Sequence, residues 1–153
     1  MKSETKRAAT AHELLMMNLS LFHLLVPVAI LSSGHIALFL TLALIASMVI
    51  IIWIARKAKQ SHNSELVQAH WQLAWRRCRL LLIGYAISAV IMLLGWGLGV
   101  MQIDPKMYGI LLVVFSRIAA VPTILVVLIL FVLSTSSLSQ ARHGELPANS
   151  MRE

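Results

Sequence analysis

The sequence predicts an all-α integral membrane protein with four transmembrane helices, both chain ends in the cytoplasm, and a cytoplasmic amphipathic helix that leads into the third span. Three observations predict this fold class: four long apolar runs, a composition that is 59% hydrophobic and 12% charged, and the grouping of basic residues in short connections. A water-soluble domain with a mean hydropathy of +0.82 would have too little polar surface. Because the runs are continuous rather than alternating, we expect helices and not the strands of a barrel.

Each apolar run is close to the ~20 residues that a helix needs to cross a hydrocarbon core of ~30 Å. The predicted spans cover residues 13–33, 36–55, 80–101 and 108–133. Residues 56–79 form a basic cytoplasmic loop, and the polar tails, 1–12 and 136–153, are expected to be cytoplasmic and mobile. No polar segment is long enough to bury a core of its own, so residues 1–153 are predicted to form a single membrane domain.

A cleaved signal peptide is the alternative interpretation of the first run. Lys2, Lys6 and Arg7 precede this run as they would in a signal sequence. The run is nevertheless longer than the ~7–15 apolar residues typical of a signal peptide, and another apolar run follows it instead of a polar domain. We therefore favour a membrane span.

The basic residues predict the orientation, because Lys and Arg in short loops are retained on the cytoplasmic side. All but two of the 13 Lys and Arg residues lie in the two tails or in residues 56–79, and the exceptions are Lys106 and Arg117. Both ends are therefore expected in the cytoplasm of a bacterial cell, beneath its inner membrane, with residues 33–35 and 102–106 outside. The net charge of +7 is a topology signal, and nucleic-acid binding is not expected because no soluble domain carries a basic face.

Cys78 is the single cysteine, which excludes a disulfide-exchange relay and a structural thiolate zinc site, because both need at least two thiols. The histidines predict no metal site either, since no two of them have close helical spacing and no carboxylate joins them. We predict no catalytic residue and no cofactor, with quinone and haem b as alternatives. A haem near the inner surface could use His12 and His70, although no feature of the sequence requires it.

Residues 65–82 predict a helix that begins before the membrane. One face collects Val67, Trp71, Ala74, Trp75, Cys78 and Leu82, and the other collects Gln68, Gln72, Arg76 and Arg79. Tryptophan and arginine are typical of the membrane interface, where the arginine heads reach lipid phosphate. Membrane-interface anchors are therefore predicted at Trp71, Trp75, Arg76, Arg77 and Arg79. The alternative is a docking surface for a partner subunit or for anionic lipid head groups.

The third span carries a row of small residues on one side: Gly84, Ser88, Gly95 and Gly99. Small residues at four-residue spacing let two helix backbones approach closely in a membrane. This row predicts tight packing of the span against a neighbour, either in the same chain or in a second copy.

Arg117 lies deep in the fourth run, and His23 lies near the middle of the first. A central arginine costs roughly 2.5–3.5 kcal/mol on insertion scales, so its cation needs a partner or water. The sequence leaves two interpretations of each residue open. Arg117 is either a structural cation or one that faces a quinone, a lipid phosphate or an anionic substrate. His23 either makes an interhelical hydrogen bond or serves a redox or proton-relay site.

These features predict a small polytopic inner-membrane protein that acts as a non-enzymatic accessory or assembly subunit of a membrane complex. Its expected partners are the lipid bilayer and other membrane subunits or further copies of itself. The alternatives are a redox subunit that binds quinone or haem near His23 and Arg117, and a small transporter that binds an anion or a lipid through Arg117.

Overall fold

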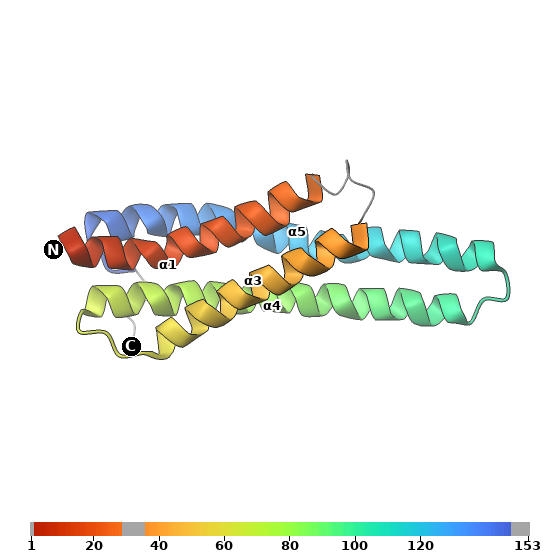
Figure 1. The fold of residues 1–153 in the computed structure, drawn as a ribbon, viewed down its shortest axis with the longest axis horizontal. Helices are drawn as coiled ribbons and strands as arrows, with labels where there is room; N and C mark the ends of the chain where they lie inside the picture. The colour runs from red at the N-terminus through yellow and green to blue at the C-terminus, as the bar shows by residue number, and fades with distance from the viewer. Residues whose placement is uncertain (1, 29–35, 148–153) are drawn as a thin grey trace. The chain divides into compact units, whose positions relative to one another are not determined.

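The computed structural model of the chain describes residues 2–28 and 36–147, and this part is almost entirely helical (Figure 1). In chain order its elements are α1 (Lys2–Ser20), η1 (Leu21–Leu25), α3 (Ile36–Lys59), α4 (Glu65–Val100) and α5 (Pro105–His143). Within the described ranges, four helices are long and apolar enough to cross a membrane: Ser3–Val28, Leu38–Lys59, Glu65–Val100 and Pro105–His143. The prediction of a helical protein with four candidate membrane-spanning helices is thus confirmed.

The helices extend beyond the predicted spans at both ends of the chain. α1 begins at Lys2 and α5 continues to His143, so much of each predicted tail is helical. Ala8, Ala11 and Ala141 in these helical parts are fully buried, and the mobility of the tails stays a prediction. Small alanine side chains at helical spacing form a packing face there in spite of the charged residues between them. Two other predicted segments, the outer turn 33–35 and residues 148–153, lie outside the described residues.

Local signals in the sequence mark both ends of α5. Asp104 caps its start, since the Asp104 Oδ1 atom accepts a hydrogen bond of 2.9 Å from the Lys106 backbone N–H, and Pro105 takes the first helical position. At the other end Gly144 has a φ of +77°, which a glycine adopts at little cost. The Glu145 N–H then donates to the Gln140 carbonyl at 3.0 Å, which closes a Schellman-type C-cap.

η1 is a short π-helical turn between α1 and the last turn of the first span. The Val26 backbone N–H donates to the Leu21 carbonyl, five residues earlier, as the π pattern requires. Pro27 follows immediately and has no N–H to continue an α-helical ladder, so it favours a local rearrangement of this kind. π-helical turns inside α-helices are frequent at functional sites, and His23 lies in the middle of this one.

The described chain divides into two compact units, and α4 and α5 contribute one segment to each. Unit 1 comprises residues 1–78 and 130–153, and it contains α1, η1, α3, the start of α4 and the end of α5. Figure 1 shows α1 in red and the blue end of α5 running side by side in this unit. Their surfaces are joined by an ion pair in which Arg142 Nη2 lies 3.1 Å from Glu13 Oε1.

Unit 2, residues 79–129, is an antiparallel pair formed by the rest of α4 and the first part of α5. The hydroxyl groups of Ser88 and Thr123 hydrogen-bond across this pair at 2.8 Å. Most large apolar side chains of the unit point outward: Ile83, Val90, Leu93, Leu94 and Trp96 on α4 are all more than half exposed. Such a surface is stable only against lipid or against another apolar surface.

Candidate functional site

Polar side chains are buried together in unit 1, in the interior formed by α1, α4 and α5. The fully or almost fully buried members are His12 and Asn18 on α1, His70 and Arg77 on α4, and Ser134 and Ser137 on α5. Helical spacing explains their burial. On α1, for example, His12 follows Ala8 by four residues and precedes Leu15 by three, so it occupies the same buried face. We call this set the polar centre.

Two histidines of the polar centre contact each other directly. His12 Nε2 and His70 Nδ1 are 2.9 Å apart, and the two ring planes are almost perpendicular. The other nitrogen of His70, Nε2, lies 3.0 Å from the backbone carbonyl of Glu145, just beyond the Gly144 cap. The three groups therefore form a continuous hydrogen-bonded chain from α1 through α4 to the residues that follow α5.

This chain of hydrogen bonds has a direction. A carbonyl oxygen can only accept, so His70 Nε2 carries a hydrogen and donates it to Glu145. In neutral His70 the Nδ1 atom then accepts from His12 Nε2, and this leaves a lone pair on His12 Nδ1. His12 Nδ1 is buried without a partner. A proton can pass between the two rings through their shared hydrogen bond. The hydrogen-bonded chain ends at His12 Nδ1, which can accept one more hydrogen bond.

Arg77 brings a positive charge into the same interior and is only 8% exposed. Its Nη2 atom donates to Ser137 Oγ at 2.7 Å, whereas Nη1 is buried and makes no hydrogen bond. Arg77 forms no ion pair with any residue that the structure describes. The charge of Arg77 also acts on both rings of the histidine pair. The interior of unit 1 thus holds a buried cation with one unpartnered donor nitrogen and a buried ring with one spare acceptor.

The polar centre contains further unpaired atoms. Both side-chain amide atoms of Asn18 and the hydroxyl of Ser134 are buried without a hydrogen-bond partner. Each such group costs about 1–3 kcal/mol when it is left unsatisfied. Concentrations of unpaired polar atoms in native interiors accompany bound water, ions or functional groups. On this evidence the polar centre is the candidate functional site.

Among the described residues, no group of three or more His, Cys, Asp or Glu side chains is placed to hold a metal ion. The two rings of His12 and His70 also do not frame a haem in this arrangement. Two histidines on opposite sides of one iron need their ligating nitrogens about 4 Å apart, at about 2 Å for each bond. Here the facing nitrogens are 2.9 Å apart and bonded to each other. Cys78 lies fully buried among apolar residues, as its place in the sequence pattern suggested.

The two ligand-binding candidates from the sequence, His23 and Arg117, fall in different units. His23 is half-buried, and its Nδ1–H donates to the Asn18 carbonyl of its own helix at 3.1 Å. Arg117 lies on the exposed surface of α5 and makes no hydrogen bond or ion pair with the described residues. A joint site for His23 and Arg117 stays a prediction.

The row of small residues faces α5 within unit 2. Adding a Cβ atom to Gly95 would place it 2.3 Å from the Cβ atom of Phe115, and a Cβ on Gly99 would lie 2.7 Å from the Tyr108 ring. A Cβ on Gly84 would lie 3.4 Å from Val126 Cγ2, an ordinary contact, and Ser88 bonds to Thr123. The close approach that these residues permit is therefore made inside one chain.

The predicted membrane-interface anchors do not share one environment. Trp71 and Arg77 are 6% and 8% exposed, so their side chains lie in the interior of unit 1 and not at its surface. Trp75 is half-buried, and Arg76 and Arg79 are exposed. Anchoring remains a prediction, and the burial of Trp71 and Arg77 favours an internal role for these two.

Sequence reasoning missed the polar centre. The sequence pattern presents His12 and His70 only as possible haem ligands, and it groups Arg77 with Arg76 and Arg79 as an interface anchor. A usable signal is nonetheless present, because Arg77 follows His70 by seven residues, or two helical turns, and so lies on the same face.

Comparison of the chain with protein-family models, with curated proteins and with solved structures finds no match.

Proposed function

We propose that the chain is a multi-pass protein of a bacterial inner membrane, with both ends in the cytoplasm, and that it acts as a non-enzymatic accessory subunit of a membrane complex. The orientation rests on the basic residues, which concentrate in the tails and in the connection between α3 and α4. In this orientation the polar centre lies toward the cytoplasmic side, and the first turns of α4 form an amphipathic helix that leads into the third span.

The proposal that the protein has a partner rests on the position of Arg117. Ala119, two residues later and thus on the opposite side of α5, is 4% exposed, whereas Arg117 points away from the packed face. The neighbours of Arg117 on its own face are the exposed apolar side chains of Val113, Val121 and Ile124. The cation therefore projects from an apolar surface with no charge beside it.

Such a cation is unfavourable against lipid tails by roughly 2.5–3.5 kcal/mol. Intramembrane charges are usually paired, and the described chain supplies no partner for Arg117. An acidic or polar side chain on a second membrane protein would satisfy the guanidinium and would cover the apolar face around it. This arrangement makes Arg117 the recognition residue of a subunit interface.

Photo-cross-linking in native membranes tests the proposal. A photoreactive residue is placed at position 117 and, in a separate variant, at position 129. Ile129 is 58% exposed on the same helix and lies about 120° around it from Arg117. We expect a reproducible adduct with one membrane protein from position 117 and a much weaker one from position 129.

A second arm compares Arg117→Leu with Ile129→Leu in purification from mild detergent. The first substitution is expected to release the partner and the second to retain it. Adducts of position 117 with lipid alone, together with a stable monomer that associates with no protein, would contradict the assignment.

A further inference from the structure

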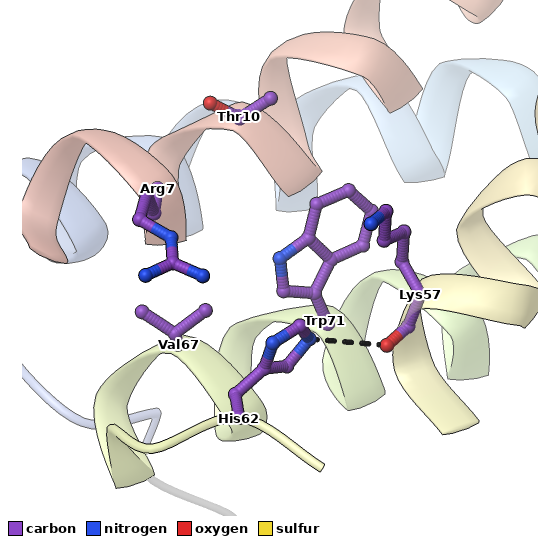
Figure 2. Close-up of a pocket in the computed structure, with 6 residues that line it drawn as sticks. All are labelled: Arg7, Thr10, Lys57, His62, Val67 and Trp71. Carbon is purple, nitrogen blue, oxygen red and sulfur yellow. Dashed lines mark hydrogen bonds between the residues drawn. The ribbon is translucent and has the colours of Figure 1, made fainter. Parts of the chain in front are cut away.

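A cavity of about 130 Å³ opens in unit 1, and its lining residues Thr10 and Trp71 are close in sequence to His12 and His70 of the polar centre. Its walls come from α1, α3, α4 and the connection between α3 and α4. The lining residues are Arg7, Thr10, Lys57, His62, Val67 and Trp71 (Figure 2). One ordered water needs about 10–15 Å³ by this measure, so the cavity has room for a group of several heavy atoms.

The charged groups of the cavity are all positive. Arg7 extends from α1 toward Val67 on α4, as Figure 2 shows, and makes no hydrogen bond or ion pair with the described residues. Lys57 Nζ donates one hydrogen bond, to Gln60 Oε1 at 3.1 Å, and an ammonium group has three hydrogens to donate. No carboxylate lines the cavity. Two cations therefore line the cavity, and Lys57 Nζ also lies over the Trp53 ring, 5.9 Å from its centroid.

Trp71 adds a neutral donor to this set. Its side chain is 6% exposed, and the indole nitrogen is turned to the side on which the Arg7 guanidinium lies (Figure 2). Trp71 makes no hydrogen bond within the described chain. The rest of its ring, with Val67, gives the cavity an apolar wall that lowers the local dielectric and strengthens charge-assisted hydrogen bonds.

Hydrogen bonds hold the remaining wall in place. His62 Nε2 donates to the Lys57 carbonyl at 3.1 Å, and the His62 backbone N–H donates to Gln68 Oε1 at 3.3 Å. Gln68 Nε2 in turn donates to the Ala58 carbonyl at 3.2 Å, which ties α4 to the end of α3. The cavity is thus formed before any ligand enters, which reduces the entropy cost of binding.

We propose that this cavity binds a phosphate group. A phosphate presents acceptor oxygens and a negative charge, which match two cations and an indole N–H with no carboxylate among the lining residues. The planar guanidinium of Arg7 suits a bidentate contact with two phosphate oxygens, and Lys57 suits a single ionic contact. The phosphate can belong to an anionic phospholipid or to a soluble compound.

The test uses the full chain purified in a maltoside detergent, which carries no phosphate group, and the readout is the shift in thermal unfolding that a ligand causes. One arm adds phosphatidylglycerol to the protein–detergent micelles, and the other adds inorganic phosphate. A stabilising shift in the first arm alone identifies a phospholipid head group. A shift in the second arm identifies a site open to soluble phosphate.

Substitutions with equal changes of charge locate the effect. Arg7→Gln and Lys57→Gln are expected to raise the half-saturating ligand concentration at least about tenfold, the loss of one charge-assisted hydrogen bond. Lys59→Gln removes the same charge from the same helical turn, but Lys59 is exposed and does not line the cavity, so binding should be retained. Arg7→Lys keeps the charge and is expected to weaken binding by less than Arg7→Gln.

Two outcomes would overturn the proposal. In one, neither lipid nor inorganic phosphate shifts the unfolding of the wild-type protein. In the other, Lys59→Gln weakens binding as much as Lys57→Gln, which would show diffuse attraction to a basic surface. The experiment compares the shifts in thermal unfolding that a ligand causes and not the absolute stability of each variant, so a moderately destabilised variant is still informative. Lys57→Gln tests the site even if Arg7→Gln does not fold.

Discussion

The imidazole rings of His12 and His70 are joined by a hydrogen bond of 2.9 Å between Nε2 of the first and Nδ1 of the second, although 58 positions separate these residues in the chain. Through the carbonyl of Glu145 the same bond chain reaches the residue that follows the α5 cap. One polar link thus connects α1, α4 and the segment that follows α5. Its contribution to stability can be measured apart from the apolar packing around it.

Removal of either histidine should destabilise the protein by about 1–3 kcal/mol, because the remaining ring is left buried with an unpaired nitrogen. The double variant His12→Ala/His70→Ala should cost less than the sum of the two single changes, since no orphaned ring nitrogen remains. Unfolding in mild-detergent micelles by a titration with SDS measures this coupling. His143 is exposed, and His143→Ala is the matched control, expected within about 0.5 kcal/mol of the wild type. Strict additivity of the two single changes would contradict a direct bond.

Ser137→Ala is expected to be more damaging than Arg77→Met. The serine variant leaves Arg77 Nη2, which now donates to Ser137 Oγ at 2.7 Å, without a partner while the charge stays buried. The methionine variant removes that charge and keeps much of the apolar volume, a change that is often neutral or stabilising when a buried charge lacks a counter-ion. The difference in unfolding free energy between these variants measures the effect, with Arg79→Met as the exposed control. A larger loss in Arg77→Met would mean that the guanidinium is better compensated than its contacts indicate.

Gly144→Ala should destabilise the end of α5 by about 1–2 kcal/mol. The φ of +77° at this position is unfavourable for any residue with a Cβ atom. Space is not the main difficulty, since the new Cβ would lie 3.4 Å from Thr5 Cγ2. Because Glu145 follows directly, hydrogen exchange should also rise at the α5 C-cap and in the first turns of α4 near His70. An unchanged exchange pattern would argue that the cap and the histidine pair are independent.

The sequence predicted the helices well because their signal is local. Runs of about 20 apolar residues specify membrane-length helices without any knowledge of their neighbours. The row of Gly95 and Gly99 was also visible, because four-residue spacing alone brings small residues to one side of a helix. The sequence could not specify which helix packs against this row of small residues. In the structure that helix is α5 of the same chain.

The polar centre could not be predicted in the same way. His12 and His70 meet only when α1 and α4 pack in one particular register, and no local pattern encodes this register. Arg76, Arg77 and Arg79 look equivalent in the sequence, yet only Arg77 is buried. The rotation of α4 decides which arginine points inward, and this rotation is set by apolar packing at Val67, Ala74 and Cys78 on the same helix.

The contact between α4 and α5 in unit 2 offers a matched pair of glycine substitutions. Gly95→Ala would place a Cβ atom 2.3 Å from the Phe115 Cβ atom, so the helices must move apart, at about 1–3 kcal/mol for overpacking. Gly97→Ala, two residues later, would meet nothing within 4 Å, and alanine favours a helix over glycine by up to about 1 kcal/mol. The two changes are thus expected to have opposite signs in an SDS unfolding titration. Phe115→Ala combined with Gly95→Ala should recover part of the loss by making room for the new methyl group. If Gly95→Ala and Gly97→Ala are equally neutral, the two helices do not approach each other as closely at Gly95 as the structure has them.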